Sequence, residues 1–378
     1  MSDSIDINLN MIKILLENFN PEIRPFVWLV SAFVLAFVIA YQTFPTILFV
    51  SNTKHLMDEP DGRSMHSNRT PTLGGIGIFF SLVVVMTIVG AMLNTKVLLL
   101  VMGGLTILFF LGLKDDLTVL SARKKFTGQI LAAALLILFT DTRIIGFSRI
   151  LDVDVLPYWV SIFFTLFVYI LIINAYNLID GVDGLAGSVA LLISTVFSVL
   201  FYNSGDLSLA TISVALIGAL TAFLRYNFSN NKKIFMGDTG SMIVGFLLAF
   251  FAISFISQTQ NDTNTLYFGS SPALILAMLF YPLMDTFRIF FIRIFILKKS
   301  PFEADRNHVH HRFILYGFSH LQTTLTIVSI NLVIIIIAFN MLHLDLNMQI
   351  ALLLVYGTVM FYAPFLIKRR LRKIRKKS

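Results

Sequence analysis

The chain has 378 residues, of which 57% are hydrophobic and only 13% are charged. Together with a mean hydropathy of +0.82, this excludes an ordinary soluble domain, in which about 45 to 50% of residues are apolar and about 25% are charged. The chain has no cysteine, which excludes a disulfide framework and thiolate chemistry and leaves Asp, Glu, Asn and His as the available metal ligands.

Apolar runs of about 17 to 25 residues, each long enough to cross a hydrocarbon core about 30 Å thick, predict the membrane-spanning segments. About eleven such runs follow an N-terminal segment. They are 26–50, 73–93, 97–113, 127–140, 157–173, 185–202, 207–224, 241–257, 272–297, 323–342 and 348–367. The predicted fold class is therefore all-α, a polytopic integral membrane protein with about eleven transmembrane helices.

The distribution of basic residues predicts the domain organisation and the orientation. Residues 1–25 are expected to lie on the outer side, because they open acidic and lack the basic start and cleavage site of a signal peptide. Residues 26–367 form one membrane-embedded domain, and 368–378 form a basic cytoplasmic tail. With this orientation, most of the 29 Lys and Arg residues lie on the cytoplasmic side. The tail directly follows an apolar run, so the net charge of +8 indicates contact with anionic lipid and not with nucleic acid.

Four polar islands interrupt the apolar sequence, and each lies at the predicted cytoplasmic end of a span. They are 114–116, 174–183, 235–238 and 308–311. Ionisable groups at membrane depth are energetically costly, and they persist mainly where they line a water-filled site, pair with one another or hold an ion. We therefore expect the function of the protein to reside in these islands.

The first island places two adjacent carboxylates, Asp115 and Asp116, near a basic loop that contains Lys125. Mg²⁺ prefers oxygen ligands, usually one or two carboxylates together with phosphate oxygens and water. This mixture of charges suits a metal and a phosphate together. On the Asp pair alone, a solvated loop that sets the topology is an equal alternative.

The second island repeats polar side chains at intervals of three, which is close to helical spacing, at Asn174, Asn177, Asp180 and Asp183. Glycines lie between them and permit a close approach of the backbone to a ligand. A helix that starts after this island would also direct its free N–H groups toward an anion. The alternative is a polar contact between two helices of the bundle.

The third island sets Asp238 in a glycine-containing turn before a span, where helix capping is an alternative role. The fourth contains His308, His310 and His311 and is followed by Arg312, and these side chains suit recognition of phosphate oxygens. A zinc site is the rival interpretation, and it would need several of these histidines on one ion.

Five ordered motifs closely resemble the polyprenyl-phosphate N-acetylhexosamine-1-phosphate transferases, glycosyltransferase family 4. They are Arg69 to Gly75, Lys114 to Asp116, Asn174 to Ala186, Phe235 to Asp238 and His308 to His311. Their order and spacing match from about Asp61 to Phe318. The stretch Pro282 to Asp285, the later Ser300 to Phe302 and the His-x-His-His form are more similar to the branch that uses UDP-N-acetylglucosamine and undecaprenyl phosphate than to the phospho-MurNAc-pentapeptide branch.

The resemblance implies a reaction and a role for each residue. N-acetylhexosamine 1-phosphate, with N-acetylglucosamine as the expected sugar, would pass from a UDP-sugar to a polyprenyl phosphate, with release of UMP. By analogy, Mg²⁺, with Mn²⁺ as the alternative ion, would be held by Asp183, Asp238 and Asp116. Phosphate oxygens would be bound by Lys125, His310, His311 and Arg312. Asp115 would orient or deprotonate the lipid phosphate, and the substrate-binding set would also include Asn174, Asn177, Asp180 and His308.

The same resemblance implies a multi-pass protein of the bacterial inner membrane whose active site faces the cytoplasm. The oligomeric state stays open, with a homodimer as one possibility. The first step of cell-envelope glycan synthesis is the expected context. A multispan transporter of an anionic solute is the main alternative, although it should show paired halves or broken helices near the midplane. A CDP-alcohol phosphotransferase would need an Ala-Arg step after Asp183-Gly184, which this chain lacks. A scaffold without catalysis would not need so many carboxylates.

Overall fold

The computed structural model describes residues 20–54, 70–93, 95–147, 155–261, 267, 269–300 and 307–375, with side chains described as far as 365. Arg69, the stretch 301–306, most of the predicted N-terminal segment and the last residues of the tail lie outside this description. The helices are α2 (Pro25–Lys54), α3 (Gly74–Leu93), α4 (Lys96–Leu117), α5 (Ala122–Thr140), α6 (Tyr158–Asn177), α7 (Leu185–Asn203), α8 (Leu207–Asn227), α9 (Gly237–Asn261), α10 (Ser271–Met278), α11 (Phe280–Phe291), the π-helix η2 (Ile292–Ile296), α12 (Val309–Leu315), α13 (His320–Asn340) and α14 (Leu346–Arg375).

The all-helical polytopic class is confirmed. Within the described part of the chain, 9 helices are long and apolar enough to cross a membrane. A further predicted span is divided into α10 and the continuous α11–η2 segment, which are bent by 76° at Leu279. The remaining predicted span lies in α5, whose first turn carries a cluster of basic residues. The count of eleven spans is therefore not confirmed and stays a prediction.

Helix α9 is the centre of the bundle. The apolar stretch of this helix is 100% buried. The helix packs against α3, α4, α6, α7 and α10. A helix that is hydrophobic on every side is expected in such a position, because it has no face that must meet water. The N-terminal end of α9 carries Asp238, so the core of the fold fixes the position of this acid.

Helix α2, an outer helix, has small residues on its inward face and larger apolar residues on its exposed face. The face of α2 that packs inward contains the small residues Ala32, Ala36 and Ala40, while Val30 and Val34 are exposed. Small residues allow close approach of helix backbones in a membrane, where lipid covers the large apolar side chains on the outside. The close partner of α2 is α8, where a Cβ at Gly218 would lie only 2.4 Å from the carbonyl oxygen of Phe33.

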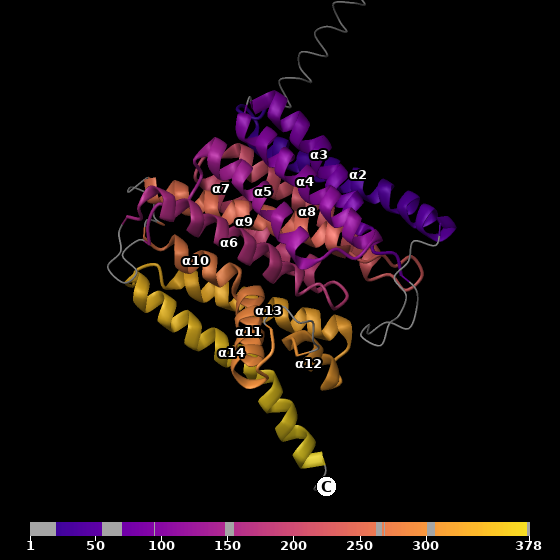
Figure 1. Ribbon diagram of the computed structural model, residues 1–378, viewed down its shortest axis with the longest axis vertical. Coiled ribbons are helices and arrows are strands. Elements are labelled where there is room, and N and C mark those ends of the chain that lie inside the picture. Colours follow the sequence, from indigo (N-terminus) through magenta and orange to yellow (C-terminus); the bar gives the residue numbers. More distant parts are fainter. Residues whose placement is uncertain are drawn as a thin grey trace, which may run out of the picture.

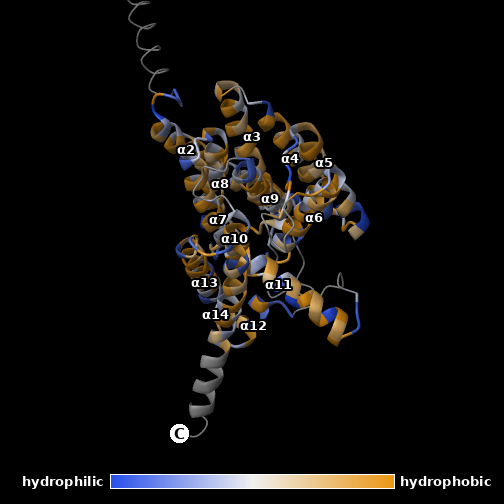
Figure 2. Ribbon diagram, turned by 90° about the vertical axis from the view of Figure 1, so that its left-hand side faces the viewer, coloured by the Kyte–Doolittle hydropathy of each residue, from blue (hydrophilic) through white to orange (hydrophobic). Residues whose placement is uncertain are grey.

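Helices α2 to α9 form one group, and the C-terminal helices α10 to α14 lie along one side of it (Figure 1). Apolar residues make up most of each helix, and polar residues gather at helix ends and in connecting segments (Figure 2). The end of α4, the segment between α6 and α7, the end of α8 and the start of α9 are joined by hydrogen bonds and ion pairs at the same end of the bundle.

Candidate active site

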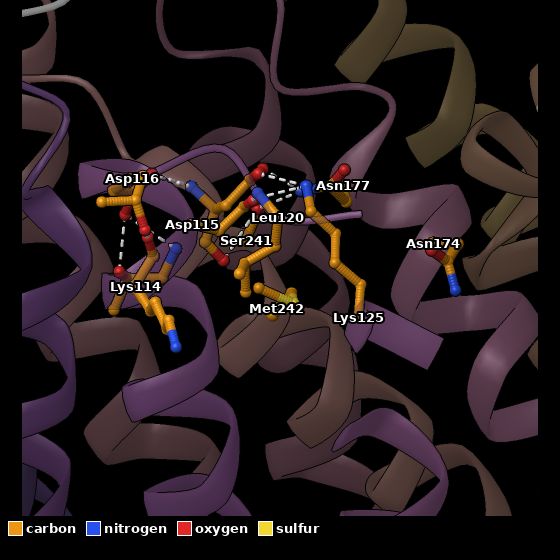
Figure 3. Close-up of polar contacts among 12 residues, drawn as sticks. Lys114, Asp115, Asp116, Leu120, Lys125, Asn174, Asn177, Ser241 and Met242 are labelled. Atoms are coloured by element: carbon orange, nitrogen blue, oxygen red, sulfur yellow. Dashed lines mark hydrogen bonds and ion pairs between the residues drawn. The ribbon is translucent and has the colours of Figure 1, made fainter. Parts of the chain in front are cut away.

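Asp115 and Asp238 share one lysine. The Nζ of Lys125, in the first turn of α5, forms an ion pair with the carboxylate of Asp115 at the end of α4, and it lies 2.7 Å from Oδ2 of Asp238 at the start of α9. The other oxygen of Asp115 accepts a hydrogen bond from the backbone N–H of Leu120 at 2.6 Å. The structure therefore brings Asp238 next to Asp115 and Lys125, which lie more than 100 residues earlier in the chain. Both oxygens of Asp115 have protein partners (Figure 3).

Asp116 caps the N-terminus of α9. Its Oδ1 accepts a hydrogen bond from the backbone N–H of Asp238 at 2.7 Å, and its Oδ2 accepts from the N–H of Thr239 at 3.0 Å and from the Thr239 hydroxyl. The first N–H groups of a helix have no partner within the helix, and a carboxylate satisfies them well. In this arrangement Asp116 positions the main chain that carries Asp238.

The glycine-containing motif that begins at residue 69 has a structural role at the same place. Gly74 and Gly75 donate backbone hydrogen bonds to the carbonyl oxygens of Phe235 and Met236, both at 2.9 Å. A Cβ at Gly75 would lie 2.2 Å from the backbone nitrogen of Gly240, so only glycine permits this approach of α3 to α9. The motif thus holds the segment that leads to Asp238.

The two asparagines of the second island have different surroundings. The Nδ2 group of Asn177 donates to Oδ1 of Asp238 and to the hydroxyl of Ser241, both at 2.7 Å. Asn174 lies apart from the carboxylates (Figure 3), and its Nδ2 donates to Oε1 of Gln129 on α5 at 2.7 Å. Asn177 therefore belongs to the acidic cluster, whereas Asn174 makes the polar contact between helices that the sequence left open as an alternative.

Asp183 contacts Lys233 and His320. Its Oδ2 lies 2.6 Å from Nζ of Lys233 and 3.0 Å from Nδ1 of His320, the first residue of α13. Its Oδ1 is buried, and no hydrogen-bond partner for it exists among the described residues. Burial raises the pKa of Asp183, but the hydrogen bonds from His320 and Lys233 outweigh it and lower the pKa below its ordinary value. Asp183 is therefore ionised at neutral pH, with one free oxygen.

Asp180 lies among the other acids. Burial raises its pKa to about 7, and the carboxylates of Asp238, Asp116 and Asp183 raise it as well. No protein donor to its carboxylate is found in the described part of the chain, and the side chain is half-buried. Asp180 is thus the acid of the cluster that has no partner of its own and is partly open to a ligand.

Asn227, at the end of α8, is a residue that the sequence analysis missed. Its Oδ1 accepts a hydrogen bond from the N–H of Gly184 at 2.5 Å, and its Nδ2 donates to the carbonyl oxygen of Ile234 at 2.8 Å. The side chain is buried. It therefore connects the loop of Asp183 to the segment of Asp238. The only signal in the sequence is its position at the end of an apolar run, which many asparagines share.

The histidine segment divides into two pairs. His308 and His310 are buried: Nδ1 of His308 lies 2.9 Å from Oδ2 of Asp285, and Nδ1 of His310 lies 3.0 Å from the hydroxyl of Tyr281. His311 is half-buried and Arg312 is exposed. Burial holds the pKa of His310 well below its ordinary value, so its ring is neutral at neutral pH. Among these four residues, His311 and Arg312 are the ones open to a ligand.

The histidine segment also meets the second island. A Cβ at Gly181 would lie 2.7 Å from Nε2 of His310 and 3.5 Å from Cε1 of His311. The glycine therefore permits the imidazoles to pack directly against the loop that runs from Asp180 to Asp183. Contacts between described residues thus connect all four islands.

The acidic side chains fit a divalent cation in charge, although the described part of the chain contains no complete ligand set. Within the described residues, no group of three or more His, Asp or Glu side chains has the geometry to hold a metal ion. The amines of Lys125 and Lys233 instead lie against the acids. Mg²⁺ usually takes one or two carboxylates and completes its coordination with phosphate oxygens and water. The free oxygen of Asp183 and the unpartnered Asp180 fit that requirement.

Comparison with known proteins identifies the family of the chain. A sequence model described as "Glycosyl transferase family 4" matches residues 98–256. The chain is 30% identical over 307 residues to the "Probable undecaprenyl-phosphate N-acetylglucosaminyl 1-phosphate transferase" of Bacillus subtilis (strain 168), which covers 81% of this chain and 82% of the relative. It is 31% identical over 314 residues to the "Decaprenyl-phosphate N-acetylglucosaminephosphotransferase" of Mycobacterium leprae (strain TN), with 77% of this chain and 78% of the relative covered.

The "Undecaprenyl-phosphate alpha-N-acetylglucosaminyl 1-phosphate transferase" of Escherichia coli (strain K12) is 30% identical over 275 residues, with 71% of each chain covered. The fold and the site define a polytopic membrane protein with an acidic centre at one end of its helix bundle. The chain belongs to glycosyl transferase family 4. The family resemblance found in the sequence motifs is thereby confirmed.

Proposed function

We propose that this protein transfers N-acetylglucosamine 1-phosphate from UDP-N-acetylglucosamine to undecaprenyl phosphate. The products are undecaprenyl diphosphate N-acetylglucosamine and UMP, and the reaction is the first membrane step of a cell-envelope glycan. The observation that carries the proposal is the convergence of Asp115, Asp116, Asp180, Asp183 and Asp238 with Lys125 at one end of the bundle, in a chain whose named relatives act on polyprenyl phosphates.

Phosphoryl transfer requires in-line placement of the two phosphates and neutralisation of their charge more than covalent work by the protein. An oxygen of the lipid phosphate attacks the sugar-bearing phosphorus, and the bond from that phosphorus to the UMP oxygen breaks. The lipid phosphate is largely dianionic at neutral pH, because its second pKa is about 6. It therefore needs little help from a base, and the ion pair of Asp115 with Lys125 supports a role for Asp115 in orienting this lysine toward phosphate.

Mg²⁺ bound at this site would neutralise charge on the diphosphate and on the leaving UMP. Asp183 and Asp180 would hold it, and Asp238 would join them once Lys125 releases its Oδ2 oxygen. Asp116 would act through the start of α9, since both of its oxygens already accept hydrogen bonds there. Lys125 and Lys233 would turn from the carboxylates to the phosphates when the substrates bind.

One diphosphate linkage breaks and another forms, so the reaction is nearly balanced in free energy and needs no ATP. The active site would face the cytoplasm, where UDP-sugars are found, and the lipid would enter from the bilayer. The transporter alternative predicts paired broken helices. The described helices contain one such bend, between α10 and α11, and no second bend that would form its counterpart.

The test is release of UMP by the purified protein in detergent. The assay contains polyprenyl phosphate, Mg²⁺ and a panel of UDP-sugars, with reactions that lack the lipid or contain EDTA as controls. Asp238→Asn should remove activity, whereas Asp206→Asn should retain it, because Asp206 caps the opposite end of α8 from the site. Addition of UMP and labelled product should regenerate UDP-sugar.

UMP release that requires lipid and metal and prefers UDP-N-acetylglucosamine would support the whole proposal. Preference for another UDP-N-acetylhexosamine would keep the reaction and change the donor. Absence of release from every UDP-sugar, with folded protein, would contradict the proposal, and flux of an anionic solute in vesicles would then be the next measurement.

A further inference from the structure

Two side chains one helical turn apart on α11 hold the histidine segment. Tyr281 and Asp285 contact His310 and His308 respectively, at 3.0 Å and 2.9 Å. All four residues are at most 5% exposed. Residues i and i+4 of a helix lie on the same face, so this face of α11 is a fixed support for the two histidines.

Asp285 has a second set of contacts that fixes the backbone around His308. Its Oδ1 accepts hydrogen bonds from the N–H of Val309 at 3.0 Å and from Arg288 at 3.1 Å, and Arg288 also donates to the carbonyl oxygen of Asn307. A buried carboxylate is strongly destabilising unless donors surround it. Asp285 and Arg288 together thus contact the backbone on both sides of His308, at Val309 and Asn307, so they specify the path of this segment.

The contacts give the histidine segment a defined geometry. The rings of His308 and His310 are nearly parallel, with centroids 5.5 Å apart, and the ring of His311 lies 4.3 Å from that of His310. His310 separates Tyr281 from Gly181. The buried pair of histidines thus fixes the distance between α11 and the second island.

We propose that Tyr281 and Asp285 are positioning residues of the transfer reaction. By holding His308 and His310, they place His311 against Gly181, with the exposed Arg312 beside it, where these two residues bind the diphosphate of the sugar nucleotide. This inference rests on the function proposed above.

The physical reason for an effect on the reaction is geometric. Misplacement of a substrate-binding group by about 1 Å lowers catalysis by up to about 100-fold, even when the mutation is remote from the chemistry. Loss of a support for the histidines should weaken binding of the sugar nucleotide. It should leave the binding of the lipid phosphate unchanged, because no contact of Tyr281 or Asp285 reaches Asp115 or Lys125.

The experiment compares KM for each substrate in Tyr281→Phe and Asp285→Asn. Tyr281→Phe removes the hydroxyl and retains the ring that stacks on Phe361 at 5.4 Å. We expect KM for the UDP-sugar to rise about 3-fold in Tyr281→Phe and about 10-fold in Asp285→Asn, with a smaller change in kcat and none in KM for the lipid.

Each variant has a matched control. Tyr169→Phe removes a buried tyrosine hydroxyl that has no partner among the described residues. Asp206→Asn removes an acid that binds Gln258 and caps α8 at the far end of the bundle. Both controls should retain the KM of the wild-type protein. In a His311→Ala background, Asp285→Asn should change KM by less than about 2-fold, because its effect acts through this histidine.

The outcomes separate this inference from the function on which it rests. Absence of UMP release by the wild-type protein contradicts the function itself. An active wild-type protein with unchanged KM in both variants overturns the inference, and so does an equal rise in KM for both substrates. If Asp285→Asn fails to fold, the KM values of Tyr281→Phe decide the inference. If neither variant folds, the two residues serve stability alone and the inference is overturned.

Discussion

The carboxylate of Asp116 accepts a hydrogen bond from the backbone N–H of Asp238 at 2.7 Å. The two acids are therefore connected through the N-terminus of α9. The replacement Asp116→Asn retains one acceptor oxygen but places an amide NH2 group next to the N–H of Thr239. An NH2 group cannot accept the hydrogen bond from this N–H. We expect a loss of stability of about 1 to 2 kcal/mol and a fall in UMP release of at least about 100-fold.

Thermal unfolding and turnover of Asp116→Asn, measured on the same preparation, check this expectation. Asp115→Asn and Asp238→Asn should also abolish transfer while the protein stays folded. Asp116→Glu is the informative companion, because it keeps the charge but shifts the carboxylate. Full activity in Asp116→Asn would remove this residue from the site.

Asn227 offers a second test, because it connects the Asp183 loop to the Asp238 segment through Gly184 and Ile234. In Asn227→Asp the donor to the Ile234 carbonyl is replaced by an oxygen, so two acceptors face each other. A buried group left without its partner is destabilising by about 1 to 3 kcal/mol. We expect a higher Mg²⁺ requirement and lower kcat as the two acidic segments separate.

The measurement is a Mg²⁺ titration of UMP release in Asn227→Asp and, as a control, in Asn331→Asp. Asn331 makes the same kind of buried bridge, from Tyr281 N–H to the Met278 carbonyl, but at the bend between α10 and α11. A similar fall in stability in both variants, with a changed Mg²⁺ requirement only in Asn227→Asp, is the expected pattern. An unchanged requirement would show that Asn227 serves the fold and not the site.

The sequence was sufficient to predict the acidic islands, because carboxylates in an apolar chain need an explanation. It also indicated that the islands lie at one end of the bundle, since each follows or precedes a predicted span. It did not predict that Asn174 pairs with Gln129 and stands apart from Asn177. Helical spacing defines only the face of a helix, and the partner on that face depends on how helices pack.

The residues that hold the site in place could not be predicted from the sequence for a related reason. Asn227, Tyr281 and His320 each contact a residue from a distant segment. Nothing in their neighbourhood along the chain differs from that of other polar residues at helix ends. The bend at Leu279 was missed as well, because an apolar run of the same length also describes a straight helix.

The pKa of Asp180 leads to a prediction about pH. Because burial and the neighbouring acids raise this pKa to about 7, the carboxyl group is largely protonated below pH 7 and charged above it. A divalent cation binds the charged form. The Mg²⁺ concentration for half-maximal activity should therefore fall as pH rises from about 6 to about 8.

In Asp180→Asn this pH dependence should flatten, since the titrating carboxyl group is absent. Any dependence that remains near pH 6 reports the second pKa of the lipid phosphate, which is also about 6. Asp206→Asn is the control and should behave as the wild-type protein. An identical pH dependence of the Mg²⁺ requirement in Asp180→Asn would exclude Asp180 as its source.

Gly237 provides a test of how closely the start of α9 fits the rest of the site. Its φ is +71°, and a Cβ there would lie 2.0 Å from the carbonyl oxygen of Thr72 and 2.8 Å from the carboxylate of Asp116. Gly205 has a φ of +78° and no neighbouring atom within 4 Å of a Cβ. Replacement of either glycine by alanine imposes the same left-handed backbone strain, of about 1 kcal/mol.

The two variants therefore differ only in the clash. Gly205→Ala should lower the free energy of unfolding by about 1 kcal/mol and keep full activity. Gly237→Ala should be destabilised further and should lose transfer, because the new methyl group displaces Asp116 from the N-terminus of α9. Thermal unfolding in detergent together with UMP release separates the two effects. Equal stability and activity in both variants would mean that the Thr72 backbone moves aside, and that the approach of α3 to α9 does not determine the geometry of the acids.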